Sequence, residues 1–90
     1  MNEREIERRF VEKVRKMGGF SYKFVSPGRS GVPDRIVVLP PGRVLFVELK
    51  RVGGKLSPLQ AHEIDRLVGL GCAAVVAYGL DEALEVLDAA

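Results

Sequence analysis

The spacing of apolar residues changes along the chain from helical to strand-like and back again. Apolar residues in the first part recur three or four positions apart, as on one face of a helix, at Ile6, Phe10, Val14 and Met17. Two later runs are continuous stretches of Val, Ile, Leu and Phe bounded by Gly and Pro, which is typical of strands. The pattern predicts helices over residues 3–17, 58–70 and 80–87, and strands over residues 20–25, 33–39, 44–50 and 72–78. The order αβββαβα describes one small α/β domain, residues 1–90, with a mixed sheet flanked by helices.

The two middle strands are predicted to form a hairpin that brings three charged residues together. Pro40-Pro41-Gly42 separates the strands and is typical of a tight turn. Folding the chain about this turn places Asp34 opposite Glu48, and Lys50 shares their face because side chains alternate along a strand. The same register pairs two sets of apolar residues, Ile36 with Phe46 and Val38 with Val44. A slip of one residue would put Asp34 on the other face from Glu48.

The opposed carboxylates at the end of this hairpin form a candidate metal site. Directly opposed side chains lie roughly 5 Å apart at Cβ, where Asp34 and Glu48 repel one another. A folded protein keeps such a pair mainly when a cation relieves the repulsion, and carboxylate oxygens suit Mg²⁺ or Mn²⁺ rather than zinc. Such a cation polarises a phosphoryl oxygen, and Lys50 would stabilise developing negative charge or help deprotonate an attacking water. Alternatively, Glu48 and Lys50 belong to a solvated, salt-bridging strand edge.

Glu7 is a carboxylate on the apolar side of the first predicted helix. At 100° per residue it projects between Val11 and Val14, whereas most other charged residues of the helix fall on the far side. A carboxylate turned toward a core is costly unless it is paired. Either Glu7 lies at the helix edge or pairs with a basic side chain, or it faces the same pocket as Asp34 and Glu48.

Gln60 also faces inward, because Ile64 and Leu67 follow it at helical spacing. Ser57 is the predicted N-cap of this helix and Gln60 stands at N3, so Gln60 is alternatively a capping-box residue that bonds back to Ser57. We expect the two roles to coexist only in part, since one side-chain amide has few contacts to offer.

The composition fits a globular domain and leaves the partner open. The net charge is only +2, from 14 basic and 12 acidic residues, so charge does not establish a nucleic-acid partner but allows a basic face around an acidic site. Cys72 is the only cysteine, which excludes a disulfide framework and points to a reducing cytoplasm. No apolar run approaches the roughly 20 residues that span a membrane, so no membrane partner is expected.

Three short segments carry a more specific signal. They are Gly31-Val32-Pro33-Asp34, Phe46-Val47-Glu48-Leu49-Lys50 and Lys55-Leu56-Ser57-Pro58-Leu59-Gln60. Together they resemble the VRR-NUC domain, the virus-type replication-repair nuclease branch of the PD-(D/E)xK superfamily. The resemblance covers nearly the whole chain and implies a restriction-endonuclease-like fold, in agreement with the predicted order of elements.

The resemblance also implies a role for each residue of the candidate site. Asp34, Glu48 and Lys50 would be the catalytic core, with the two carboxylates as metal ligands. Glu7 would be an acidic helper that adds a ligand. The backbone carbonyl of Leu49 would be a further ligand, and Gln60 would support the active site. Stand-alone members of about this size resemble viral Holliday-junction resolvases and usually act as homodimers. The expected location is the cytoplasm, which for a viral protein is that of a bacterial host.

A site that cuts DNA needs basic groups around it to receive phosphates. The candidates flank the site in the sequence: Lys23, Arg29, Arg35, Arg51 and Lys55. Each of them, taken singly, is alternatively a solvated surface charge. The loops over residues 26–31 and 53–54 contain glycines that would permit a close approach of the DNA backbone.

Two functional hypotheses follow. The first is a Mg²⁺-dependent, structure-selective endonuclease that hydrolyses phosphodiester bonds in branched or duplex DNA, as a homodimer that places two sites across a junction. Leu59 and Leu70, opposite the inward side of their helix, are candidates for the dimer surface. The alternative is a non-catalytic nucleic-acid-binding module that keeps the fold without cutting. Three interacting charges kept together at Asp34, Glu48 and Lys50 favour the first.

Overall fold

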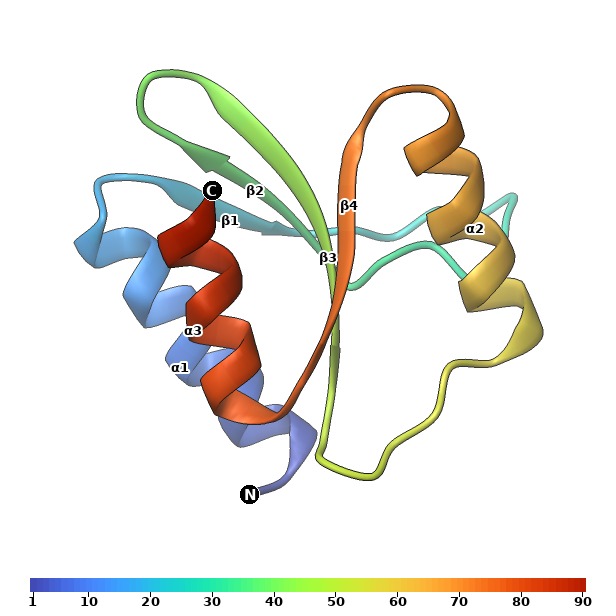
Figure 1. Cartoon of the computed structure of the whole chain (residues 1–90), viewed down its shortest axis with the longest axis horizontal. Coiled ribbons are helices and arrows are strands. Elements are labelled where there is room, and N and C mark those ends of the chain that lie inside the picture. The colour runs from blue at the N-terminus through green and yellow to red at the C-terminus, as the bar shows by residue number, and fades with distance from the viewer.

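The computed structural model describes all of residues 1–90 and confirms the predicted order of elements (Figure 1). The helices are α1 (Glu3–Lys16), α2 (Pro58–Gly69) and α3 (Gly79–Ala89), and the strands are β1 (Phe20–Lys23), β2 (Arg35–Leu39), β3 (Arg43–Lys50) and β4 (Ala73–Tyr78). Asn2 caps α1 by accepting a hydrogen bond from the backbone of Glu5, and Ser57 caps α2. None of the three helices is long and apolar enough to cross a membrane.

The strands form one mixed sheet in the order β1-β2-β3-β4. β1, β2 and β3 are antiparallel neighbours, whereas β4 runs parallel to β3. The predicted register of the hairpin is confirmed, since Ile36 pairs with Phe46 and Val38 pairs with Val44. Because side chains alternate along β3, this register directs Glu48 to the same face of the sheet as Phe46.

The hydrophobic core lies on one face of the sheet, beneath α1 and α3, which pack side by side (Figure 1). α1 contributes Ile6, Phe10 and Val14, as its apolar spacing predicts, and all three are buried. The sheet meets them with Val37, Leu39, Leu45, Val47, Leu49 and Ala77. Since burial of one large aliphatic side chain contributes about 1.5–3 kcal/mol, this layer holds α1 firmly against the sheet.

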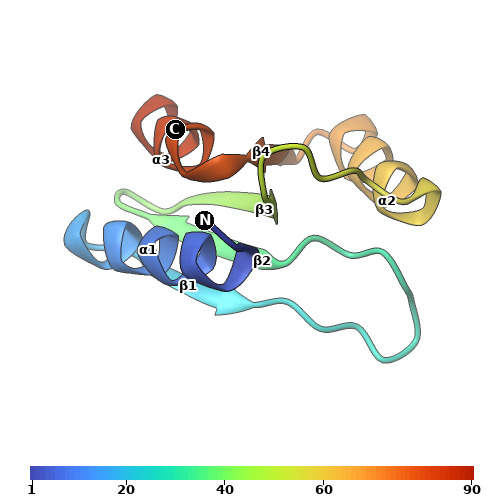
Figure 2. The same ribbon diagram turned by 90° about the horizontal axis from the view of Figure 1, so that it is seen from below.

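The opposite face of the sheet is covered only in part. α2 packs against β4, away from β1 and β2 (Figure 2). It leaves an apolar surface, here called the open face, formed by Phe20, Tyr22, Phe24, Ile36, Val38, Val44 and Phe46. Phe20 is 70% exposed, Tyr22 57% and Val44 47%, so large apolar side chains of this face meet water. This half of the sheet lacks the second layer that usually covers an apolar face.

β3 continues beyond the end of its pairing with β2. The last pair between them is Arg35 with Val47, whereas residues 48–50 pair only with β4. Asp34 turns its backbone toward β1 instead, where its carbonyl accepts a hydrogen bond from the N–H of Phe24 at 2.9 Å. The strand predicted from residue 33 therefore begins at Arg35, and β3 keeps an unpaired backbone edge next to Asp34.

Candidate active site

The side chain of Asp34 occupies the unpaired edge of β3. Its Oδ2 accepts a hydrogen bond from the backbone N–H of Leu49 at 3.0 Å. In a strand the N–H and C=O of one residue point toward the same neighbouring strand. The carbonyl of Leu49 therefore points into the same gap as the Asp34 carboxylate, while the Leu49 side chain is buried in the core.

Glu48 is a carboxylate almost entirely removed from water. Only 2% of the residue is exposed, and its Oε1 has no hydrogen-bond partner. Its Oε2 accepts a hydrogen bond from the side-chain amide of Gln60 at 3.2 Å and lies 3.6 Å from Nζ of Lys50. Burial, together with the negative charge of Asp34, raises the pKa of Glu48 to about 7, although the positive charge of Lys50 opposes the shift.

The structure thus brings Asp34, Glu48 and Lys50 together at the end of the hairpin. A solvated strand edge does not describe this position, because Glu48 is buried although β3 has no β2 partner there. The raised pKa of Glu48 comes first from burial and then from the nearby charge of Asp34, which the predicted register places beside it.

Gln60 serves both of the roles that the sequence suggests for it. Its side-chain oxygen accepts a hydrogen bond from the backbone N–H of Ser57 at 2.9 Å, and its own backbone N–H donates to Ser57 Oγ at 3.1 Å. The amide nitrogen remains available and donates to Glu48. The expectation that the two roles coexist only in part is therefore wrong, because the oxygen and nitrogen of one amide serve different partners.

Glu7 combines the two interpretations of its position. Its Oε2 accepts a hydrogen bond from Nε of Arg35 at 2.9 Å, and its side chain is 28% exposed. It also lines a cavity of about 210 Å³ together with Glu3, Arg4, Lys23, Asp34 and Leu49. Glu48 does not line this cavity, because it projects from the opposite face of the sheet, and no three acidic side chains converge closely enough to hold one ion. The predicted three-acid pocket is therefore a pair, Asp34 with Glu48, with Glu7 on the far side of Asp34.

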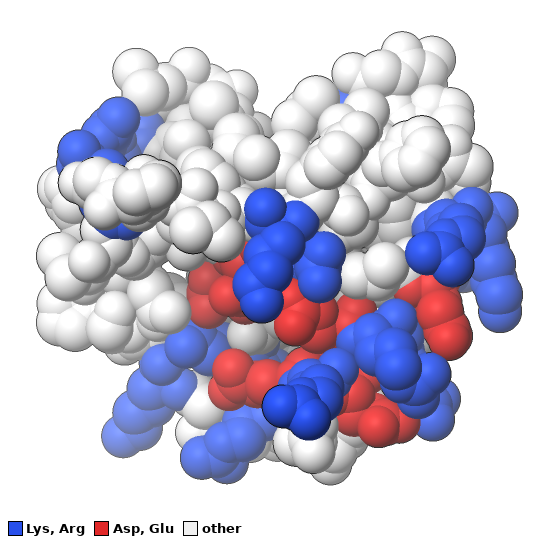
Figure 3. All heavy atoms as spheres, turned by 180° about the vertical axis from the view of Figure 1, so that it is seen from behind, with Lys and Arg blue, Asp and Glu red and all other residues white.

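The five predicted DNA-contacting residues fall into two groups. Arg35 and Arg29 are engaged in ion pairs, Arg35 with Glu7 and Arg29 with Glu63. Arg51 and Lys55 lie exposed in the segment between β3 and α2 without such a partner, and Lys23 lines the cavity next to Asp34. Figure 3 shows basic side chains interspersed with acidic ones on the lower half of one side of the molecule, below a largely uncharged surface.

Glu63 is an acidic partner of Arg29 that the sequence did not reveal. It is buried in α2, and its Oε1 accepts a hydrogen bond from Nε of Arg29. This hydrogen bond and the positive charge of Arg29 hold the pKa of Glu63 below its usual range. One signal was available, because Glu63 stands three residues after Gln60 and so shares the inward side of the helix.

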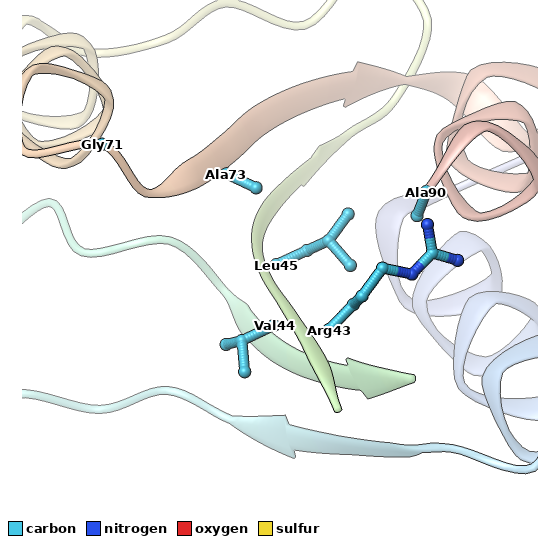
Figure 4. Close-up of a pocket in the computed structure, with 6 residues that line it drawn as sticks. All are labelled: Arg43, Val44, Leu45, Gly71, Ala73 and Ala90. Atoms are coloured by element: carbon cyan, nitrogen blue, oxygen red, sulfur yellow. The ribbon is translucent and has the colours of Figure 1, made fainter. Parts of the chain in front are cut away.

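A second cavity lies at the other end of β3 (Figure 4). It measures about 390 Å³ and is lined by Arg43, Val44, Leu45, Gly71, Ala73 and Ala90. Figure 4 shows Arg43 extending toward Ala90. No acidic side chain lines it, so it offers none of the chemistry of the hairpin end.

The residues at the hairpin end fit a hard divalent cation. Oε1 of Glu48 is a buried carboxylate oxygen without a partner, and it belongs to a residue beside Asp34. The Leu49 carbonyl faces the same gap as Asp34. Two carboxylates and a carbonyl are the oxygen donors that Mg²⁺ and Mn²⁺ prefer.

Known proteins are similar to this chain in sequence and in fold. Residues 2–81 match the family described as the VRR-NUC domain. The phage protein “Putative nuclease p44”, from Acyrthosiphon pisum secondary endosymbiont phage 1, is 53% identical over 76 residues, which cover 84% of this chain and 82% of that protein. The fold, the site and these matches define a nuclease.

Two solved structures have the same fold as this chain. One, a VRR-NUC domain, superimposes with a TM-score of 0.89 at 30% identity and covers 96% of this chain and 94% of the other. A second VRR-NUC domain protein has the same fold, with a TM-score of 0.78 at 21% identity over 98% of this chain and 86% of the other. The chain belongs to the VRR-NUC family.

Proposed function

We propose that this nuclease is a divalent-metal-dependent, structure-selective DNA endonuclease, and that four-way junctions are its preferred substrates among branched and duplex DNA. The observation that carries the proposal is the buried carboxylate of Glu48 beside Asp34. Glu48 has an oxygen without a partner and a pKa raised to about 7. An arrangement that is electrostatically unfavourable by itself becomes favourable when a cation binds between the carboxylates.

Each residue of the site has a proposed part in hydrolysis. Asp34, Glu48 and the carbonyl of Leu49 would hold Mg²⁺ or Mn²⁺, which when bound polarises the scissile phosphate and acidifies water. Gln60 holds Oε2 of Glu48, which would leave the unpartnered Oε1 available to the ion. Lys50 would orient the attacking water or stabilise charge that develops on the phosphate.

Glu7 would act from the other side of Asp34. Arg35 holds its Oε2, which fixes the side chain at the cavity that Asp34 also lines. A hydrogen bond to water in this cavity suits its position better than direct contact with the ion, because no three acidic side chains converge.

Phosphates of the DNA would reach the site past basic side chains that have no ion-pair partner. Lys23 lines the cavity next to Asp34, and Arg51 and Lys55 follow β3 directly. Contacts of this kind give affinity without sequence preference, as a nuclease that selects DNA by its branching requires.

The open face is the proposed interface of a homodimer. It carries exposed Phe20, Tyr22 and Val44. Stable interfaces bury about 800 Å² per partner around an apolar centre, and no other sheet face lacks a covering layer. A two-fold dimer would present two sites to a junction. Leu59, in α2, and Leu70, at the C-cap of α2, are exposed as predicted but do not belong to this face.

A cleavage assay tests the proposal. Wild type is expected to cut four-way junctions in Mg²⁺ or Mn²⁺ faster than flaps and linear duplex, and not in EDTA. Asp34→Asn and Lys50→Ala should lower the rate by about 100-fold or more, whereas Lys16→Ala, at an exposed lysine near the end of α1, should cut normally. Equal inactivity of wild type and Lys50→Ala on all three substrates would reject the enzyme and leave the non-catalytic binding module.

A further inference from the structure

We infer that Arg29 and Glu63 form a positioning pair, which holds the loop over residues 24–34 against α2 and thereby sets Asp34 and Gln60 on either side of Glu48. The inference rests on the proposed function for its meaning, since it concerns the alignment of the metal site. The contact itself is a property of the metal-free protein.

The first anchor of the loop is the ion pair. Nε of Arg29 donates to Oε1 of Glu63, across 34 residues of sequence. The side chain of Glu63 is only 8% exposed, whereas that of Arg29 is 47% exposed. A buried carboxylate is costly unless it is paired. The guanidinium is therefore held over α2 by a group that has lost most of its contact with water.

A second anchor lies one turn earlier along α2. Gly31 has a φ of +86°, and a Cβ on it would lie 2.7 Å from the backbone carbonyl of Leu59. Only a glycine permits this approach. The loop thus touches α2 at two points, Gly31 at Leu59 and Arg29 at Glu63.

The loop and α2, which this contact joins, each carry a residue of the active site. The loop leads through Pro33 into Asp34, whose carboxylate accepts from Leu49 N–H, and α2 carries Gln60, whose amide donates to Glu48. α2 otherwise packs against β4, on the far side of β3 from Asp34. The Arg29–Glu63 pair therefore joins the element that carries Asp34 to the element that carries Gln60.

This role differs from the predicted contact of Arg29 with DNA. A phosphate that captured Arg29 would leave Glu63 buried without its partner. Arg51 lies exposed without an ion pair and is the matched control. If the pair has a positioning role, substitution of Arg29 and substitution of Glu63 should have the same effect. If Arg29 contacts a phosphate, only its own substitution should matter.

The test compares Arg29→Gln, Glu63→Gln, the double variant and Arg51→Gln. In metal-free protein, amide hydrogen exchange at Phe24 and Leu49, whose N–H groups both donate to Asp34, should accelerate about tenfold in each of the first two variants, and the double variant should add little to either. Binding of Mn²⁺, measured by calorimetry, should weaken several-fold in the same three proteins. Arg51→Gln should change neither quantity but should reduce the salt dependence of duplex binding by about one phosphate contact.

Three results would overturn the inference. One is that Arg29→Gln reduces the salt dependence of DNA binding while Glu63→Gln leaves exchange and Mn²⁺ affinity unchanged. Another is that the effects of the two substitutions add, since residues that act as one unit are not additive. The third is that Arg29→Lys, which keeps the charge, and Arg29→Gln both exchange at Phe24 and Leu49 as slowly as wild type, while only Arg29→Gln binds DNA more weakly. Hydrogen exchange needs no catalysis, so these outcomes remain distinct from an absence of cleavage.

Discussion

The side-chain amide of Gln60 joins the N-cap of α2 at Ser57 to the buried carboxylate of Glu48. Its oxygen accepts from the Ser57 backbone at 2.9 Å, and its nitrogen donates to Glu48 Oε2 at 3.2 Å. The start of a helix and one side of the site are therefore held by the same group. A substitution that removes only the amide nitrogen of Gln60 should affect the contact with Glu48 and leave the helix cap intact.

Gln60→Glu is expected to impair catalysis with little effect on the fold. Glutamate retains the oxygen that caps Ser57, so the free energy of unfolding should change by no more than about 1 kcal/mol. It removes the donor to Glu48 and adds a third carboxylate, which should weaken Mg²⁺ binding or cleavage about 10- to 100-fold. Thermal melting and cleavage rates measured against Mg²⁺ concentration check this.

Ser57→Ala is the matched control for that substitution. It removes the hydroxyl that accepts from the Gln60 backbone, at a cost of about 1 kcal/mol in stability, and leaves the amide of Gln60 intact. Ser57→Ala should therefore lower the melting temperature more than it lowers the cleavage rate. Wild-type cleavage by Gln60→Glu would show that the contact with Glu48 has no part in the reaction.

The metal-free protein is expected to lose stability as the pH rises from about 4.5 to about 7. Glu48 has a folded pKa raised to about 7 from its usual 4.5, so in this range the folded protein holds a proton that the unfolded chain has released. Stability then falls with increasing pH, by no more than about 3 kcal/mol. Urea unfolding in EDTA at pH 5, 6, 7 and 8 measures it.

Glu48→Gln is the control for this pH dependence. It keeps an acceptor for Gln60 and removes the titrating proton, so its stability should vary less than that of wild type over the same range. The raised pKa of Glu48 would be contradicted if the stability of wild type increased from pH 5 to 7. It would also be contradicted if Glu48→Gln showed the same pH dependence as wild type.

Metal binding should release a proton below pH 7. The ion requires Glu48 in its charged form, so the apparent affinity for Mn²⁺ should fall by up to about tenfold per pH unit below the pKa and level off above it. Calorimetry in buffers of different ionisation enthalpy should find close to one proton released at pH 6 and far fewer at pH 8.5. An equal affinity at both pH values would exclude Glu48 as a ligand.

Val44→Glu should dissociate the proposed dimer. Val44 is 47% exposed on the open face, so a charge there costs little in the monomer but would be buried at the interface. Sedimentation should find a dimer for wild type and a monomer for this variant. Val52→Glu, at a 76% exposed valine in the segment after β3, is the control and should remain a dimer. A wild type that is monomeric at all concentrations would reject the interface.

Local patterns carried the prediction of the fold and of the carboxylate pair. Pro40-Pro41-Gly42 marked the turn, and folding the two apolar runs about it gave the register, confirmed from Arg35–Val47 to Leu39–Arg43, that brings Asp34 toward Glu48. Both signals are local in sequence, because a tight hairpin joins neighbouring strands.

Long-range partners could not be predicted in the same way. Arg29 was assigned to DNA and Glu63 was overlooked, because their contact depends on how a loop folds over a helix 34 residues away. The pairing of Arg35 with Glu7, 28 residues apart, was left open for the same reason. An exposed charge and a paired one look alike in a sequence, and only the packing of α1 and α2 tells them apart.

The late start of β2, at Arg35, has a consequence for experiments on this site. It frees the main chain of Leu49, whose N–H is bound by Asp34 and whose carbonyl faces the same gap. No side-chain substitution removes that carbonyl, and replacing Leu49 disturbs the core instead. An alanine scan therefore cannot measure the contribution of the Leu49 carbonyl. A backbone change can, such as an amide-to-ester replacement at residue 50, which makes this carbonyl oxygen a weaker ligand.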